Sequence, residues 1–251
     1  MIYKANCKIN VHLRIVGKLP NGYHELETIF QEIPLYDEIK ISLNSTGKIT
    51  FNSSGIPIPD GGTNICVKSA ELLKEKYQVS KGCEISLKKN IPIGAGLGGG
   101  SSDAATVLKA LNELWELNIS VVELEKVGLE LGADVPFFIK GGCALATGIG
   151  EVLTPIKPVL NDGYILLIYP NIHINTSEAY RNLNLNLTKK ASNGIFALAL
   201  KSSSEIHSKF DEFSNDFESY VFKEHDEIEI IKNALLNEGA EFAAMSGSGS
   251  S

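Results

Sequence analysis

Apolar and polar residues alternate strictly near the start of the chain. Apolar side chains occupy every second position from Ala5 to Ile15, and polar or charged side chains fill the positions between them. Successive side chains of a β-strand point to opposite faces, so the alternation predicts a half-buried strand over residues 5–15. Lys8 and Asn10 then share its polar face, which is either solvated or lines a site.

The remaining patterns divide the chain into a strand-rich first part and a helix-rich second part. Strands are predicted over residues 38–43, 48–52, 83–88, 135–139, 143–147, 164–169 and 240–245. Helices are predicted over residues 64–77, 103–115, 120–132, 176–182, 194–201, 205–220 and 226–237. This segregation favours an α+β fold over a regular βαβ array.

A cluster of turn-forming residues interrupts the pattern near the middle of the chain. Pro155, Pro158 and the turn Asn161-Asp162-Gly163 stand close together there. Such clusters are typical of connections between domains, so we expect one domain over residues 1–153 and a second over residues 154–251.

Composition narrows the class of protein. The 251 residues are 43% hydrophobic and carry a net charge of −7, which argues against a general nucleic-acid-binding surface. The four cysteines form no CxxC pair, which argues against a zinc or redox motif. The first residues hold no signal-peptide pattern, and no apolar run is long enough to span a bilayer, so we expect a cytoplasmic protein.

The strongest candidate for a functional site is the glycine-rich run from Pro92 to Ser102, PIGAGLGGGSS, which leads directly into a helical pattern. Five of its eleven positions are glycine. Glycine lets the backbone approach a ligand closely, and a helix N-terminus directs N–H groups and a positive dipole at an anion. The run therefore predicts a phosphate-binding loop.

The residues of this loop allow three general interpretations to be compared. A Walker loop is excluded, because no lysine follows the final glycines. A dinucleotide-binding fingerprint is matched by Gly94, Gly96 and Gly99, but the preceding segment is charged and interrupted by Pro92, whereas the fingerprint follows a buried strand. A turn without a ligand is the third interpretation, and so many glycines would make it costly.

The loop resembles the P-x-G-x-G-L-G-S-S loop of the galactokinase–homoserine kinase–mevalonate kinase–phosphomevalonate kinase superfamily. Its GLGGGSS variant is most similar to the branch that phosphorylates a cytidyl-linked methylerythritol in non-mevalonate isoprenoid synthesis. Further segments resemble that branch in the same order along the chain: residues 5–10, 21–26, 131–138, 213–216 and 245–249.

This resemblance implies a two-domain α+β fold for an ATP-dependent small-molecule kinase that uses Mg²⁺. The N-terminal ATP-binding domain would be ribosomal-protein-S5-like, and the C-terminal substrate-binding domain would be ferredoxin-like. We expect a monomer or homodimer whose partners are ATP and a small cytidyl substrate, without nucleic acid or membrane.

The resemblance also implies catalytic roles for Asp134 and Lys8. Asp134 would take the proton of the acceptor hydroxyl, and Lys8 would keep that carboxylate ionised and stabilise the transferred phosphoryl group. From its own surroundings, between Gly132 and Pro136, Asp134 could equally be a turn-forming residue.

Nucleotide binding is implied for the glycine run together with Asn64 and Lys89. Each of these two has a plainer alternative, because Asn64 could simply cap a helix and Lys89 could be an exposed lysine. Ser101 and Ser102 could contact phosphate or Mg²⁺, or could cap the following helix. Asp103 is not expected to bind the nucleotide, because its negative charge would repel phosphate. The implied nucleotide set is Pro92, Gly94, Gly96, Leu97, Gly98, Gly99, Gly100, Ser101, Ser102, Asn64 and Lys89.

Substrate binding is implied for five residues. Tyr23 and His24 would bind the cytidine end, Asn10 would contact the substrate beside Lys8, and Thr176 and Tyr180 would reach it from the second domain. The alternatives are another kinase of the superfamily, such as a homoserine or mevalonate kinase, and an inactive binding protein on the same scaffold. Tyr23 and His24 argue against the first alternative, and Lys8 with Asp134 argues against the second.

The chain ends inside the segment that resembles the third glycine motif of the superfamily, Met245 to Gly249. In the superfamily a strand and a helix follow this motif. We therefore expect the second domain to be incomplete in the printed sequence.

Overall fold

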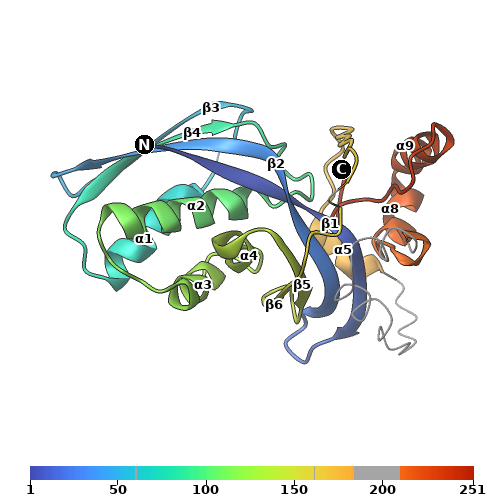
Figure 1. The fold of residues 1–251 in the computed structure, drawn as a ribbon, viewed down its shortest axis with the longest axis horizontal. Coiled ribbons are helices and arrows are strands. Elements are labelled where there is room, and N and C mark those ends of the chain that lie inside the picture. The colour runs from blue at the N-terminus through green and yellow to red at the C-terminus, as the bar shows by residue number, and fades with distance from the viewer. Residues whose placement is uncertain (60, 161, 184–209) are drawn as a thin grey trace. The chain divides into compact units, whose positions relative to one another are not determined.

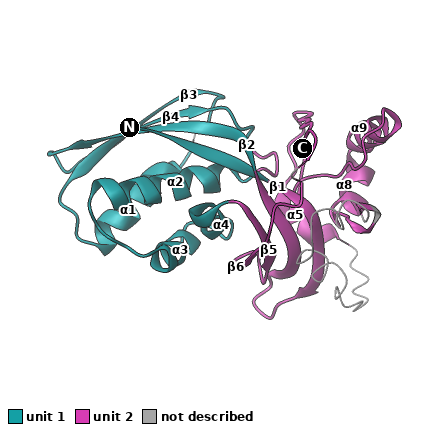
Figure 2. Ribbon diagram, viewed as in Figure 1, with its two compact units in different colours: residues 1–8, 33–93, 98–141 teal, residues 9–32, 94–97, 142–251 magenta. Residues whose placement is uncertain are grey.

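The computed structural model describes the chain except for residues 60, 161 and 184–209 (Figure 1). The chain forms two compact units that interleave along the sequence (Figure 2). Unit 1 comprises residues 1–8, 33–93 and 98–141, and unit 2 comprises residues 9–32, 94–97 and 142–251. Two long strands, β1 (Ile2–Lys18) and β2 (His24–Asn44), contribute residues to both units.

Unit 1 combines strands with four helices. The last part of β2 pairs antiparallel with β4 (Gly82–Lys89), and β3 (Ile49–Gly55) pairs in parallel with β4. The helices are α1 (Ile65–Lys76), α2 (Gly99–Leu114), α3 (Val121–Leu129) and α4 (Val135–Lys140). Within this unit, α1 and α2 pack together along one side of the strands (Figure 1).

Two of these helices begin where the sequence predicts. The Asn64 Oδ1 accepts a hydrogen bond from the N–H of Cys66 at 2.9 Å, and the Ser120 Oγ accepts one from the N–H of Glu123 at 3.3 Å. Each side chain thus satisfies an N–H group that has no partner inside its helix. The capping role expected for Asn64 is confirmed, and the helix predicted from residue 120 has Ser120 as its N-cap.

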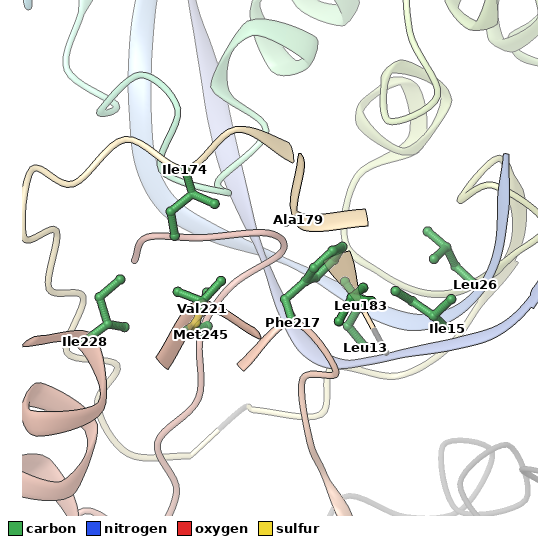
Figure 3. Close-up of a cluster of buried hydrophobic side chains, with 10 residues drawn as sticks. All are labelled: Leu13, Ile15, Leu26, Ile174, Ala179, Leu183, Phe217, Val221, Ile228 and Met245. Carbon is green, nitrogen blue, oxygen red and sulfur yellow. The ribbon is translucent and has the colours of Figure 1, made fainter. Parts of the chain in front are cut away.

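Unit 2 is built on the remaining parts of β1 and β2. There β2 pairs antiparallel with β5 (Cys143–Thr147), which pairs antiparallel with β6 (Val152–Pro155). Its helices are α5 (Thr176–Asn182), α8 (Glu218–Glu224) and α9 (Asp226–Asn237), with a short 3₁₀ turn, η1 (Phe210–Glu212). Its apolar core joins β1 and β2 to these helices (Figure 3): Leu13, Ile15, Leu26, Ile174, Ala179, Leu183, Phe217, Val221, Ile228 and Met245.

A short segment before α8 runs beside β1 within unit 2. The N–H of Leu13 donates to the carbonyl of Ser214 at 2.8 Å, and the N–H of Asp216 donates to the carbonyl of Leu13 at 3.0 Å. The Asp216 carboxylate accepts the N–H of Ile15 at 2.7 Å. These bonds fix residues 213–216 against the strand.

The predicted strand over residues 135–139 is wrong, because this segment forms helix α4. Pro136 lies in its first turn, where the missing N–H costs nothing, and Gly141 ends it with a φ of +72°. The apolar run between them suits either a buried strand or a buried helix, and periodicity alone does not separate the two.

Three other expectations for the second half also fail. Residues 164–169 and 240–245 form no strand, and the predicted helix over 205–220 is reduced, among the described residues, to η1 and the start of α8. A strand requires a hydrogen-bonded neighbour, which an apolar run cannot supply by itself. The predicted helix over 194–201 lies outside the described residues.

The α+β fold class is confirmed. The predicted boundary at residues 153/154 falls inside unit 2 and stays a prediction about domains. Over the part of the chain that the structure describes, no helix is long and apolar enough to cross a membrane.

Candidate active site

Strand β1 and the start of α4 bring Lys8 and Asp134 together in unit 1. The Lys8 Nζ lies 3.8 Å from the Asp134 Oδ2; the Lys8 side chain is 5% exposed and the Asp134 side chain 34% exposed. Burial lowers the pKa of Lys8, and the nearby Asp134 carboxylate opposes that shift. A buried cation thus lies beside a carboxylate that solvent and a substrate can reach.

The end of the glycine loop lies against Lys8. Gly98 precedes α2 with a φ of +67°, a left-handed conformation that favours glycine. A Cβ at Gly98 would lie 3.2 Å from the Lys8 Cε and 2.9 Å from the Phe138 ring. The N-terminus of α2, with its unpaired first-turn N–H groups and positive dipole, therefore begins next to Lys8.

The two loop serines differ in their surroundings. Helix α2 begins at Gly99, so Ser101 and Ser102 lie inside its first turns, and the predicted helix-capping role is wrong for both. The Ser102 Oγ donates to the carbonyl of Asn6 at 2.5 Å, and Ser102 is buried. Ser101 is partly exposed, which leaves it as the better candidate for a contact with phosphate or a metal ion.

Lys89 is buried rather than exposed, so the plainer alternative for this residue is wrong. Its Nζ donates to Asp37 Oδ2 at 2.5 Å and to Asp103 Oδ2 at 2.7 Å. Burial lowers the pKa of Lys89, but the carboxylates of Asp103 and Asp37 outweigh it and the net shift is upward. Asp103, left out of the predicted site, thus neutralises a lysine of that site.

Asn64 acts as the N-cap of α1, with its side-chain oxygen bonded to the N–H of Cys66. Its predicted contact with the adenosine of ATP stays a prediction. The earlier loop residues Pro92, Gly94, Gly96 and Leu97 form the connection that leads to α2.

In unit 2, a chain of neutral hydrogen bonds surrounds Asn10. The Asn10 Nδ2 donates to Thr28 Oγ1 at 2.7 Å, and that hydroxyl donates to the carbonyl of His12 at 2.6 Å. The N–H of Asn10 donates to Ser246 Oγ, which donates to the carbonyl of Gly96, each at 3.1 Å. The third glycine motif and the first glycine loop are thus joined through one serine.

Asn215 holds the same C-terminal segment. Its Nδ2 donates to the carbonyls of Met245 at 2.8 Å and Gly247 at 2.7 Å, while its Oδ1 accepts the N–H of Phe217 at 3.0 Å. Because Asn215 is buried and uses both its amide hydrogens, it fixes the course of residues 245–247.

Two predicted substrate residues stack in unit 2. The rings of His24 and Tyr180 lie 4.9 Å apart and are inclined by 14°, and Tyr180 meets Phe217 edge to face. Thr176, at the start of α5, shares a hydrogen bond of 2.7 Å with Ser248. Tyr23 is exposed, and its N–H donates to Asn21 Oδ1 at 3.1 Å.

Sequence reasoning missed Asp37, Asp103 and Thr28 as members of these polar groups. The sequence did hold a signal for Asp37 and Asp103. Lys89 falls on the same face of its strand as the apolar residues Cys83, Ile85 and Leu87, so it is expected to be buried. A lysine on a buried face needs carboxylate partners. For Thr28, whose partner lies 18 positions away, we find no comparable signal.

The fold is that of small-molecule kinases. Residues 64–142 match the family model described as the GHMP kinases N terminal domain. A crystal structure of homoserine kinase from Cytophaga hutchinsonii superposes with a TM-score of 0.64 at 19% identity, covering 99% of this chain and 82% of that chain, a likeness of fold.

Closer similarity defines the family. A 4-diphosphocytidyl-2-C-methyl-D-erythritol kinase from Clostridioides difficile (strain 630) is 43% identical over 246 residues, 98% of this chain and 83% of its own length. A crystal structure of 4-(cytidine 5'-diphospho)-2C-methyl-D-erythritol kinase superposes with a TM-score of 0.77 at 30% identity, covering 100% of this chain and 88% of that chain. The chain belongs to the 4-diphosphocytidyl-2-C-methyl-D-erythritol kinase family and is an ATP-dependent small-molecule kinase.

Proposed function

We propose that the protein transfers the γ-phosphate of ATP to the 2-hydroxyl of 4-diphosphocytidyl-2-C-methyl-D-erythritol, with Asp134 and Lys8 as catalytic residues. The observation that carries this chemistry is the Lys8–Asp134 pair, 3.8 Å apart, next to the end of the glycine loop at Gly98. Family membership supports the choice of acceptor.

In the proposed reaction the acceptor oxygen attacks the γ-phosphorus, its proton passes to the Asp134 carboxylate, and ADP leaves with the bond electrons. Lys8 stabilises negative charge on the acceptor oxygen and the transferred phosphoryl group. Its burial strengthens that effect, because charges are screened less where water is excluded.

The first turn of α2 is the proposed site for the triphosphate. Its N–H groups and dipole favour an anion there, and Lys8 adds a positive charge beside Gly98. Mg²⁺ fits this arrangement, because it needs only one or two protein oxygen ligands together with phosphate oxygens. Ser101 offers such an oxygen, and the bound ion would neutralise phosphate charge.

The acceptor-binding residues we propose are Asn10, Tyr23, His24, Thr176 and Tyr180. The stacked pair of His24 and Tyr180 presents flat aromatic surfaces suited to a pyrimidine base. Asn10 and Thr176 offer amide and hydroxyl groups for the polyol or its diphosphate.

The domain division and the cellular compartment also remain proposals. We keep the division into a catalytic domain over residues 1–153 and a substrate-binding domain over residues 154–251. We also place the reaction in the cytoplasm, which four buried free cysteines suit, since a reducing compartment keeps thiols unpaired.

The proposed acceptor is tested by measuring ADP release with three compounds in parallel. We expect turnover with the cytidyl-linked methylerythritol and none above background with mevalonate or homoserine. Release of ADP with mevalonate or homoserine alone would contradict the proposed acceptor. Failure with all three, in a chain that binds ATP calorimetrically, would favour a binding protein on the same scaffold.

A further inference from the structure

A buried cluster of three charged side chains lies at the base of the glycine loop in unit 1. Lys89 donates to Asp37 and Asp103, and the three side chains are 5%, 0% and 3% exposed, respectively. Charges taken out of water are tolerated only with close partners, so two carboxylates around one ammonium require accurate placement.

The cluster joins the two ends of the loop. On the entering side, Asp37 Oδ1 accepts the N–H groups of Asn90 at 2.6 Å and Ile91 at 2.8 Å, directly before the loop. On the leaving side, Asp103 belongs to α2, which starts where the loop ends. Lys89 connects the two carboxylates.

Gly99, the first residue of α2, packs directly on this cluster. A Cβ at Gly99 would lie 3.0 Å from the Lys89 Nζ and 3.0 Å from the Ile91 Cγ2. The first turn of α2, which carries the N–H groups, therefore packs directly against the Lys89 side chain. A change in the position of Lys89 would move the donors that the proposed function assigns to the triphosphate.

We propose that Asp37, Lys89 and Asp103 are positioning residues that hold the two ends of the glycine loop at the spacing required to bind the ATP triphosphate. The proposal rests on the proposed kinase function. It gives Lys89 a role through the loop, because two of its ammonium hydrogens are directed at carboxylates.

The first test compares Asp37→Asn, Lys89→Met and the double variant. Asp37 is fully buried, so it acts on ATP only through the loop. We expect each single variant to raise the KM for ATP about tenfold or more, since small displacements of binding groups cost that much. The KM for the acceptor should change less than about twofold, and the double variant should be no worse than Lys89→Met alone.

Matched controls lie one position along the same strand pair. Glu38 on β2 faces Lys88 on β4, and these two side chains form an exposed ion pair of 2.8 Å. Glu38→Gln and Lys88→Met should leave the KM for ATP unchanged. The proposal would be overturned if folded Asp37→Asn had the wild-type KM for ATP. It would also be overturned if the effects of Asp37→Asn and Lys89→Met on that KM multiplied in the double variant.

A second pair of variants covers the case in which Asp37→Asn does not fold. Asp103→Asn keeps an oxygen acceptor for Lys89, whereas Asp103→Leu removes it at similar volume. We expect near-normal ATP affinity for the first and a loss of about tenfold or more for the second. Equal affinities in the two would also overturn the proposal.

Binding of ATP to the whole chain, measured by calorimetry without any acceptor, separates this proposal from the proposed function. If no acceptor is phosphorylated, the comparison of ATP dissociation constants among the variants still tests the cluster. If the wild type turns over the cytidyl substrate and the variants bind ATP like the wild type, only the positioning role fails.

Discussion

The two units hold their glycine-rich segments by different chemistry. In unit 1 the loop end at Gly98 and Gly99 is seated on charged side chains, namely Lys8 and the cluster of Asp37, Lys89 and Asp103. In unit 2 the C-terminal glycine motif is held by neutral groups, chiefly Asn215, Ser246 and Asn10.

This difference follows from what each segment must do. A loop that receives a triphosphate works in a strong negative field. The Lys8 cation attracts the anion, and the charged cluster with its fixed partners resists displacement by it. The C-terminal glycine motif can be held in a fixed backbone conformation by neutral hydrogen bonds, because neutral polar groups cost less free energy to bury than charges. Substitutions of the charged residues beneath the unit 1 loop should therefore act mainly on catalysis, and substitutions of Asn215 in unit 2 mainly on stability.

Lys8→Met should cause a large loss of catalysis in unit 1. Removal of the cation leaves the phosphoryl group without its buried positive partner, which should lower kcat about 10²–10³-fold. The melting temperature should stay close to the wild type, because burial already disfavours the charged form of Lys8. A kcat within fivefold of the wild type would show that the unit 1 charges do not serve catalysis.

For unit 2, Asn215→Asp tests the neutral network. The substitution replaces two N–H donors by an oxygen that faces the carbonyls of Met245 and Gly247. We expect the free energy of unfolding to fall by about 3 kcal/mol in urea titrations. Asn182→Asp, whose side chain is exposed and bonds Tyr220, is the control and should change it by less than about 0.5 kcal/mol.

The pH dependence of stability should separate the units, because their buried titratable groups shift in opposite directions. Burial raises the pKa of Asp103 to about 7, with Lys89 opposing and Asp37 reinforcing the shift. Between pH 4 and pH 7 the folded chain keeps a proton that the unfolded chain releases, so this contribution is lost as the pH rises. Burial, assisted by Arg14, lowers the pKa of His12 to about 4.

For His12 the sign is reversed: the unfolded chain binds a proton below pH 6.5 that the folded chain takes up only near pH 4. Its contribution is therefore lost as the pH falls. Relative to the wild type, Asp103→Asn should gain stability towards pH 7.5, and His12→Asn should gain stability towards pH 4.5. Urea titrations at several pH values between 4.5 and 7.5 measure the unfolding free energies of both variants. If these free energies changed with pH as in the wild type, the pKa shifts assigned to Asp103 and His12 would be contradicted.

The smallest effect is expected at the surface of unit 1. Glu38→Gln breaks an exposed ion pair with Lys88, and solvent screening should keep the loss of unfolding free energy small. Thermal unfolding measures the change. A loss as large as that of Asp37→Asn would remove the distinction between buried and exposed charges on which the comparison depends.

Local patterns predicted much of unit 1 and less of unit 2. Strand β1, which both units share, and the N-cap at Asn64 follow from alternation and capping, which act over a few residues. The pairing of Lys89 with Asp37 and Asp103 depends on contacts 52 and 14 positions apart, which no local pattern specifies.

Unit 2 illustrates the same limit. The apolar run 164–169 has the composition of a strand, but pairing is a property of its neighbours. In unit 1, helix α4 was predicted as a strand because Phe137, Phe138 and Ile139 favour strands, whereas Pro136 and burial favour the helix. The family motifs nevertheless located Lys8 and Asp134, which the fold brings to 3.8 Å.

The most direct test of the catalytic assignment is the kinetics of Asp134→Asn, with Glu130→Gln as an exposed control that breaks only the ion pair with Lys76. We predict that Asp134→Asn binds ATP within about threefold of the wild type while kcat falls about 10²–10⁴-fold, the usual loss when a general base is removed. A kcat close to that of Glu130→Gln would contradict the assignment of Asp134 as the base.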